Sequence, residues 1–123
     1  MIIGHGVDII DIVRIKKAIM ESARFTKKVF TSAEIEYCEG KKDKYQSYAG
    51  KFASKEAFLK AIGTGWAKGI AFTDVEIVND NDGKPDIVLH NTAKEYFESK
   101  GYKKILVSIS HTDSVATGSV IIY

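Results

Sequence analysis

The sequence predicts an α+β fold in a single domain, with a mainly antiparallel sheet packed against one long helix. The expected elements run strand, several helices, hairpin, helix and two strands, without the regular strand–helix alternation of a doubly wound sheet. The chain has 123 residues, of which 45% are hydrophobic, and this composition suits one core rather than a disordered segment. No internal repeat or linker interrupts it, so residues 1–123 are expected to form one domain.

The first half of the chain predicts a strand followed by helices. Thr31 followed by Glu34 has the spacing of a capping box, which indicates the start of a helix. Gly63 is expected to end the longest helix. The expected ranges are a strand over 2–10, a helix over 11–23, a connecting piece over 25–30, a helix over 31–39 and the long helix over 44–63.

The second half predicts a hairpin, a helix and two further strands. Asp82-Gly83 is a strong hairpin signal. Thr92 and Glu95 again have capping-box spacing, and Gly101 is expected to end the helix that follows them. The expected ranges are a loop over 66–69, strands over 70–78 and 87–89, a helix over 93–100, and strands over 105–110 and 115–123.

One acidic residue of the long helix falls where an apolar residue is expected. At about 100° per residue, Glu56 projects into the middle of an apolar stripe. A charge that faces a core is costly unless it is paired or coordinates a cation. Either the stripe ends early, or Glu56 pairs with Lys60 one turn further on, or it faces a ligand. The stripe consists of Tyr45, Tyr48, Ala49, Phe52 and Leu59.

Asp8 is a second acid in an informative position. The predicted first strand places it on the same face as Gly4 and Gly6, and glycine within a strand often marks close approach by a ligand or another backbone. Asp8 is either a structural acid at a strand end or a partner of Glu56. Two carboxylates from distant segments suit Mg²⁺, which favours one or two carboxylates plus substrate phosphates and water.

Basic residues and glycines near Glu56 indicate an anionic ligand, although each alone has a simpler explanation. Lysine binds phosphate as a point charge, but an isolated lysine is usually only solvated. The glycine turn after the helix would let backbone amides approach a phosphate, yet it lacks the spacing of a P-loop. The residues concerned are Lys51, Lys55, Lys60, Gly63 and Gly65.

His111 is expected at a strand end, where functional residues are common. A histidine there can act as a base or donate to an anionic oxygen, although a structural role is more frequent. Zinc held by Asp8, Glu56 and His111 fits by ligand type, but no spacing supports it. Ser110, His111 and Asp113 are adjacent in sequence, which argues against a hydrolase triad, and no GxSxG elbow is present.

Charge and cysteine content limit the partners and the compartment. A net charge of +2 is too balanced to indicate a nucleic-acid binder. The single cysteine, Cys38, cannot form an internal disulfide, and no leader or membrane-spanning run is apparent, so a reducing, cytoplasmic location is expected. A basic cluster in the first helices is either a solvated face or a docking face for an acidic macromolecule: Arg14, Lys16, Lys17, Arg24, Lys27 and Lys28.

Three segments in order resemble the motifs of the AcpS-type 4′-phosphopantetheinyl transferases, the short bacterial holo-acyl-carrier-protein synthases. Residues 4–9 (GHGVDI) are similar to the opening G-[IV]-D motif. Residues 50–60 (GKFASKEAFLK) are similar to the central F-x-x-K-E-[AS]-x-x-K motif, and residues 107–112 (VSISHT) to the terminal S-[IL]-[ST]-H motif. The resemblance covers essentially the full chain, and the ordered set is more specific than any one motif.

This resemblance implies transfer of the phosphopantetheine arm of coenzyme A to a serine of apo acyl carrier protein, in support of fatty acid biosynthesis, with release of adenosine 3′,5′-bisphosphate. It implies that Asp8 and Glu56 hold Mg²⁺ against the pyrophosphate. It further implies that the phosphates and the nucleotide are met by Lys51, Lys55, Lys60, Gly63, Gly65, Ser110, His111 and Thr112. Lys51 departs from the arginine of many members, which replaces a bidentate contact by a point charge.

The resemblance also implies how the enzyme works with its partners. Glu56, or a water near it, would accept the proton of the attacking serine, and His111 would assist. Arg14 and Arg24 would dock the acidic carrier protein. A homotrimer with sites between subunits is implied, so that Asp8 and His111 of one site come from different chains. The alternatives are a non-catalytic module that binds coenzyme A or a nucleotide, which would not need both acids, and a structural or partner-binding protein.

Overall fold

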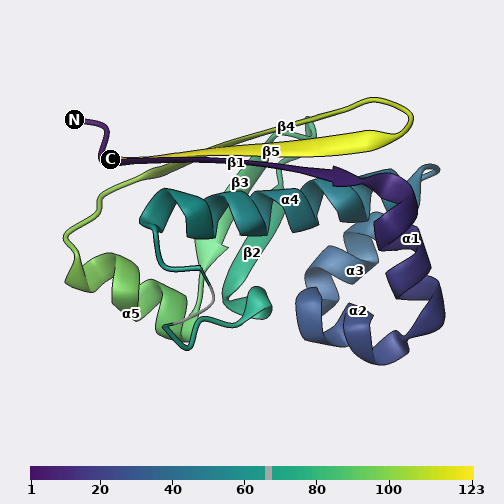
Figure 1. Cartoon of the computed structure of the whole chain (residues 1–123), viewed down its shortest axis with the longest axis horizontal. Helices are drawn as coiled ribbons and strands as arrows, with labels where there is room; N and C mark the ends of the chain where they lie inside the picture. The colour runs from purple at the N-terminus through teal and green to yellow at the C-terminus, as the bar shows by residue number, and fades with distance from the viewer. Residues whose placement is uncertain (66–67) are drawn as a thin grey trace.

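The computed structural model describes residues 1–65 and 68–123 (Figure 1). Its elements are β1 (Gly4–Asp11), α1 (Ile12–Glu21), α2 (Ala23–Val29), α3 (Ser32–Glu39), α4 (Lys44–Ile62), the 3₁₀ turn η1 (Phe72–Asp74), β2 (Val75–Asn79), β3 (Pro85–Leu89), α5 (Asn91–Ser99), β4 (Ile105–His111) and β5 (Val115–Ile122). None of the helices in these two ranges is long and apolar enough to cross a membrane.

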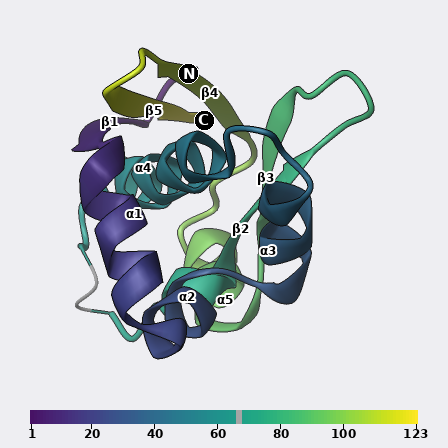
Figure 2. The same cartoon turned by 90° about the vertical axis from the view of Figure 1, so that its right-hand side faces the viewer.

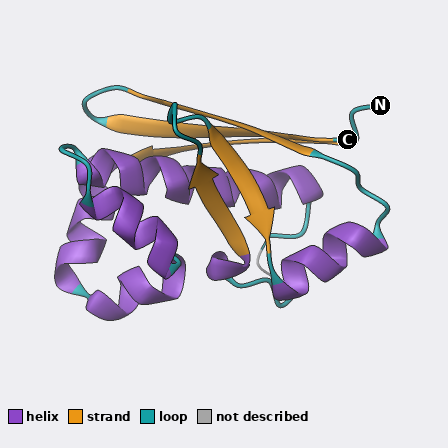
Figure 3. Ribbon diagram, turned by 180° about the vertical axis from the view of Figure 1, so that it is seen from behind, coloured by secondary structure: helices purple, strands orange, loops and turns teal. Residues whose placement is uncertain are grey.

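The long helix α4 lies between the two sheets. An antiparallel sheet in the order β1-β5-β4 covers one side of it, and the antiparallel hairpin β2-β3 lies on another side (Figures 1 and 2). Helices α1, α2 and α3 gather around one end of α4, while α5 lies towards the other end (Figure 3). The prediction of an α+β fold with a mainly antiparallel sheet packed against a long helix is therefore confirmed, although the strands form two sheets rather than one.

Glycines allow α4 to lie directly on the three-stranded sheet. A Cβ atom at Gly4 or Gly6 of β1 would collide with the backbone carbonyls of Ala61 and Ala57 of α4. A Cβ atom at Gly118 of β5 would come within 2.6 Å of the Ser54 backbone nitrogen, which is closer than real contacts allow. Of the two explanations for the glycines of the first strand, close approach by another backbone is the one that the structure supports.

Helix α4 is buried on most of its circumference, because elements pack against it from several sides. Two core clusters lie along it, one with the hairpin and α5 and one with α1, α2 and α3. The predicted apolar stripe is therefore only part of the buried surface of α4, and its members Tyr48, Ala49 and Leu59 are buried. The buried side chains of α4 include polar ones outside that stripe, namely Lys51, Ser54 and Lys55.

Most of the predicted boundaries hold, with three corrections. The connecting piece expected over 25–30 is largely helix α2, since the Ser22 side chain accepts a hydrogen bond from Phe25 N and caps a short helix. The capping box expected at Thr92 is wrong, because α5 already begins at Asn91. The strand expected from residue 70 begins only at Val75, after η1.

The capping box and the glycine stops predicted at the ends of elements are confirmed. The Thr31–Glu34 capping box is present in both directions, at 3.1 and 2.8 Å. Gly63 and Gly83 take the left-handed backbone conformation, with φ of 76° and 85°. Residues 66 and 67 of the expected loop lie outside the described residues.

Candidate functional site

A groove between β1 and α4 brings Asp8 and Glu56 together. It has a volume of about 460 Å³, and α1 and α2 supply its remaining walls. Both acids are only partly exposed. The groove is lined by Asp8, Ile9, Ile10, Arg14, Ile15, Ala18, Phe25, Phe52 and Glu56. We refer to it as the acidic groove.

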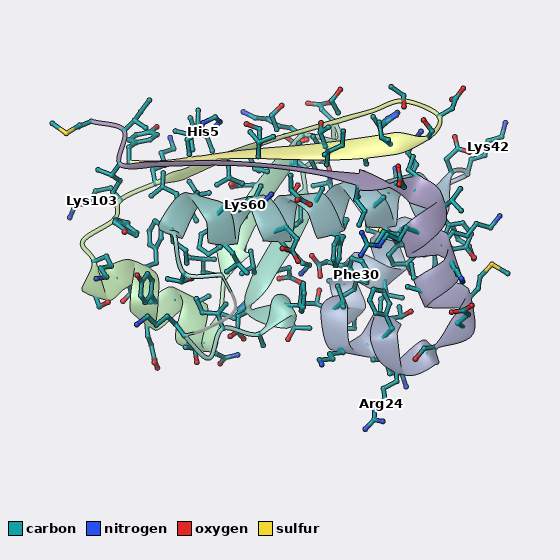
Figure 4. The ribbon with its side chains drawn as sticks, in the orientation of Figure 1. His5, Arg24, Phe30, Lys42, Lys60 and Lys103 are labelled. Atoms are coloured by element: carbon teal, nitrogen blue, oxygen red, sulfur yellow. The ribbon has the colours of Figure 1, made fainter. Side chains whose placement is uncertain are left out.

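Helical spacing explains why α4 presents Glu56 to this groove. Phe52, Glu56 and Lys60 follow one another at intervals of four residues and therefore share one face of the helix. The Lys60 ammonium donates to Asp8 Oδ1 at 3.0 Å and to the Val7 carbonyl at 3.1 Å. Figure 4 shows Lys60 on α4 close beneath β1. One helix face thus supplies an acid and a cation beside the acid on the strand.

The donor set of the acidic groove fits Mg²⁺ better than zinc. Within residues 1–65 and 68–123, no cluster of three or more His, Cys, Asp or Glu side chains could hold a metal ion. Zinc takes about three or four protein ligands, whereas Mg²⁺ binds through one or two carboxylates and completes its shell with phosphates and water. The zinc site considered from Asp8, Glu56 and His111 is therefore not supported.

His111 lies in a different cavity, of about 220 Å³, between α3, α4, the β2-β3 hairpin and β4. Gly50 lets α4 approach β4 here, since a Cβ atom at this position would come within 2.8 Å of Ile109 Cγ2. The cavity is lined by Tyr37, Gln46, Ser47, Gly50, Lys51, Asn79, Gly83, Pro85, Ile109 and His111. We refer to it as the His111 pocket.

Lys55, expected to contact phosphate, is instead part of the protein interior. Its side chain is fully buried, and its ammonium pairs with Glu34 Oε1 at 2.9 Å. It also donates to the Phe72 and Val75 carbonyls at 2.8 and 2.6 Å, so three partners match its three N–H bonds. Burial lowers its pKa, and the Glu34 carboxylate opposes this shift. We therefore assign Lys55 a structural role.

Lys51 lines the His111 pocket but is itself almost wholly buried, at 2% exposure. Its ammonium donates to the Ile77 carbonyl at 2.9 Å and to Asn79 Oδ1 at 2.6 Å. It also lies 4.5 Å from the centre of the Tyr37 ring. Burial lowers the pKa of Lys51. These contacts tie α4 to the hairpin.

Several of the predicted ligand-binding residues in the glycine turn and at the end of β4 have structural roles or face away from the two cavities. The amide of Gly63 donates to Leu59 and Lys60 carbonyls, so it ends the helix, while Gly65 is exposed with φ of 56°. Ser110 alternates with His111 along β4 and lies on the opposite face of the sheet. The Thr112 hydroxyl accepts from the amides of Ser114 and Val115 and closes the β4-β5 turn.

Arg14 and Arg24 lie on the first two helices, at the acidic groove and beyond it. Arg14 lines the groove, and both arginines are exposed. Figure 4 shows Arg24 at the lower edge of the view, pointing away from α2. Of the basic cluster predicted from the sequence, Arg14 lines the acidic groove, while Arg24 is exposed on the neighbouring helix α2. Cys38, by contrast, is fully buried, and burial raises the pKa of its thiol to about 12.

The two cavities lie on different sides of α4. Lys51 and Glu56 are about 140° apart around the helix axis at about 100° per residue. The His111 pocket opens beside β4 and the hairpin, and the acidic groove opens beside β1 and α1. Sequence reasoning missed Tyr37, Asn79 and Pro85 of the pocket. The Asp-Gly signal marks a hairpin there but does not show where the hairpin packs.

Similar proteins share both the sequence and the fold. A family model described as the 4′-phosphopantetheinyl transferase superfamily matches residues 4–117. Proteins named holo-[acyl-carrier-protein] synthase from Solibacter usitatus and Ruminiclostridium cellulolyticum are 43% and 50% identical. These alignments cover 99% and 95% of this chain, and 98% and 89% of the two relatives.

Solved structures of similar proteins superimpose over nearly the whole chain. The holo-[acyl-carrier-protein] synthase from Neisseria meningitidis matches with a TM-score of 0.91 at 27% identity, covering 100% of this chain and 99% of that one. The enzyme from Helicobacter pylori, in complex with coenzyme A, matches with a TM-score of 0.85 at 32% identity, covering 97% and 99%. The chain therefore belongs to the 4′-phosphopantetheinyl transferase superfamily.

Proposed function

We propose that this protein is a holo-[acyl-carrier-protein] synthase. It transfers the 4′-phosphopantetheine arm of coenzyme A to a serine of apo acyl carrier protein and releases adenosine 3′,5′-bisphosphate. The observation that carries this proposal is the meeting of Asp8 and Glu56 in one groove bordered by Arg14. The similarity of the chain to holo-[acyl-carrier-protein] synthases over nearly its whole length supports the same activity. We further propose that the enzyme acts in the cytoplasm and supplies holo acyl carrier protein for fatty acid biosynthesis.

The reaction exchanges one bond to phosphorus for another. The serine oxygen bonds to the β-phosphorus of coenzyme A, the bond from that phosphorus to the bridging oxygen breaks, and the nucleotide leaves with the electron pair. Asp8 and Glu56 would hold Mg²⁺, which when bound neutralises the pyrophosphate. Glu56, or a water beside it, accepts the serine proton. Lys60, which is 55% exposed in its side chain, turns from Asp8 towards a phosphate.

The His111 pocket is the proposed seat of the nucleotide. His111 is exposed at the end of β4 and lines this pocket, and its proposed role is to donate to an anionic oxygen of the nucleotide. Thr112 and Gly65 are proposed to contribute near the phosphates. Ser110 faces the other side of the sheet, so its proposed contact is with the nucleotide of a neighbouring subunit's site.

The separation of the two cavities supports a homotrimer with sites between subunits. The acidic groove and the His111 pocket lie on different sides of α4, so one chain does not present both halves to one ligand. The outer face of the three-stranded sheet is also apolar and exposed, which suits an interface between copies. Its exposed side chains include Ile3, Val7, Ile9 and Leu106, at 44–63% exposure.

Mixing two inactive variants tests this arrangement. Asp8→Asn damages the acidic groove and His111→Ala damages the pocket, so each homotrimer is expected to be inactive. After unfolding and refolding together, mixed trimers contain some sites with both halves intact, and activity returns. No recovery, or a monomer in sedimentation equilibrium, would contradict the shared site.

The proposed activity itself is tested by mass spectrometry of the carrier. Protein, coenzyme A, Mg²⁺ and an apo acyl carrier protein are incubated together, and the carrier is expected to gain the mass of the arm. Omission of Mg²⁺, with a chelator present, is expected to prevent the gain. A carrier of unchanged mass alongside tight binding of coenzyme A would favour the non-catalytic binding module instead.

A further inference from the structure

We infer that Asn79 is a positioning residue for coenzyme A. Its side chain links Lys51 to the tip of the β2-β3 hairpin and so fixes the position of the wall of the His111 pocket. This inference rests on the proposed function. Asn79 lies at the end of β2 and lines the pocket together with Gly83 and Pro85. It therefore stands at the junction between the helix and the hairpin wall.

Both ends of the Asn79 carboxamide are engaged. Its Oδ1 accepts from the Lys51 ammonium at 2.6 Å, and its Nδ2 donates to the Gly83 carbonyl at 3.1 Å. The first contact is to a charged donor and is the stronger type. A single side chain thus connects α4 to Gly83, the residue whose amide closes the turn on the Asp80 carbonyl.

The helix end of this connection is fixed. Lys51 is 2% exposed, and its ammonium also donates to the Ile77 carbonyl at 2.9 Å and lies over the Tyr37 ring. Immobilising this lysine leaves its ammonium poorly placed to follow a ligand. The expected phosphate contact of Lys51 is therefore replaced here by a role that acts through Asn79.

The turn end of the connection is held together by its own hydrogen bonds. Asp80 Oδ1 accepts from the amides of Asp82 and Lys84, both at 2.9 Å, and Asp80 and Lys84 are further joined through their backbones at 3.0 Å. Because the turn is closed internally, its placement against α4 depends on the strands and on Asn79. Releasing Asn79 lets the tip shift as a whole and changes the width of the pocket.

Two substitutions disturb the contacts of Asn79 in different ways. Asn79→Ala removes both hydrogen bonds, while Asn79→Asp keeps the acceptor for Lys51 and places an acceptor against the Gly83 carbonyl. Both are expected to raise KM for coenzyme A by about 3- to 10-fold, as the loss of one or two hydrogen bonds would. The kcat and the KM for the carrier are expected to stay within about twofold. Asn81→Asp, which adds the same charge in the same exposed turn, is the matched control.

A double-mutant cycle identifies the route through Lys51. Lys51→Met is expected to raise KM for coenzyme A, and adding Asn79→Ala is expected to raise it no further. Lys51→Arg, which keeps a donor for Asn79, is expected to restore most of the affinity. Multiplying effects would show that Lys51 contacts the ligand itself and would overturn the inference. So would an unchanged KM in Asn79→Ala.

Calorimetric binding of coenzyme A keeps this test distinct from the test of the proposed function. If the wild-type protein binds coenzyme A but transfers nothing, the proposed transferase function fails, and the dissociation constants of the same variants decide the role of Asn79. If the wild-type protein does neither, both proposals fail. A melting temperature within a few degrees of wild type shows that Asn79→Ala is folded.

Discussion

The ammonium of Lys60 lies 3.0 Å from Asp8 Oδ1, so a cation of α4 already neutralises one of the two acids proposed to hold Mg²⁺. The lysine is more exposed than the acid, at 55% against 17% of the side chain. An ammonium and a metal ion compete for the same carboxylate, because each satisfies its charge. We expect occupancy of the site by Mg²⁺ to be coupled to the departure of Lys60 towards a phosphate.

Lys60→Met tests this competition. Without coenzyme A, the variant is expected to bind Mn²⁺ several-fold more tightly than the wild type, since a nearby positive charge has been removed. Coenzyme A is expected to bind it more weakly. Titration followed by electron paramagnetic resonance measures free Mn²⁺ directly, and Lys60→Arg serves as the control of equal charge. Weaker Mn²⁺ binding in the methionine variant would contradict the competition.

Glu56→Gln is expected to lower kcat at least about 100-fold, because the variant loses a metal ligand and a proton acceptor. The amide has nearly the same shape, so the melting temperature is expected to stay within a few degrees of wild type. Glu36→Gln, at an exposed position of α3, is the matched control. Activity within a fewfold of wild type in Glu56→Gln would refute the central assignment.

Arg14→Glu is expected to raise KM for the acyl carrier protein at least about tenfold, while the dissociation constant for coenzyme A changes little. Reversing a charge at a docking surface slows the association of an acidic partner and flattens its salt dependence. Arg24→Glu should act in the same direction. The control is Lys100→Glu beyond the end of α5, and equal losses in carrier and coenzyme A affinity would argue against docking.

Lys55→Met is expected to lower the free energy of unfolding by about 3–5 kcal/mol, because it leaves the buried Glu34 without its partner. Adding Glu34→Gln should recover part of the loss, since the uncompensated charge is then removed. Lys44→Met breaks the exposed pair with Glu39 and should cost under about 1 kcal/mol. Urea titration measures all four proteins, and a Lys55→Met loss as small as that control would contradict the role of the pair.

Cys38 is expected to make the protein less stable at alkaline pH. Burial raises its pKa from 9.0 to about 12, so the folded state retains a proton that the unfolded state loses. The resulting stability is complete below pH 9.0 and is lost as the pH rises towards about 12. Burial raises the pKa of Tyr48 as well, but Tyr48 is present both in the wild type and in a Cys38→Ala variant, so a comparison of the two isolates the thiol.

Urea titrations of the wild type and Cys38→Ala at several pH values from 8 to 11 isolate this contribution. Above pH 9.0 the wild type should lose up to about 1.4 kcal/mol per pH unit more than the variant. Below that pH the two curves should differ by a constant, which reflects the missing thiol. Parallel curves over the whole range would contradict the burial of the thiol.

Features that depend on neighbouring residues can be predicted from the sequence, whereas those that depend on long-range packing cannot. The Thr31–Glu34 box and the glycine stops at Gly63 and Gly83 depend on a few neighbouring residues, and they are confirmed. The helical position of Glu56 predicts a residue with a special role, and Glu56 lines a groove together with Asp8. Such features are encoded by the period of the helix and by local backbone conformation.

The lysines show what sequence reasoning could not reach. Lys51 and Lys55 belong to the same motif as Glu56, yet both are buried against β2 and η1. Only packing against η1 and β2, 17 to 26 residues further along the chain, decides whether these lysines meet solvent or carbonyl oxygens. The Glu34 carboxylate illustrates this limit. Its role in the capping box is predictable, but its hydrogen bond from Ile77 N and its ion pair with Lys55 are not.

The contact between Gly6 and the Ala57 carbonyl determines more than how tightly two elements pack. Asp8 follows Gly6 on the same face of β1, and Glu56 precedes Ala57 on α4, so the spacing of the two acids is set by main chain resting on main chain. Substitutions in the surrounding core are therefore expected to leave the separation of the two acids unchanged, whereas a side chain at Gly6 would push β1 away from α4 and widen it.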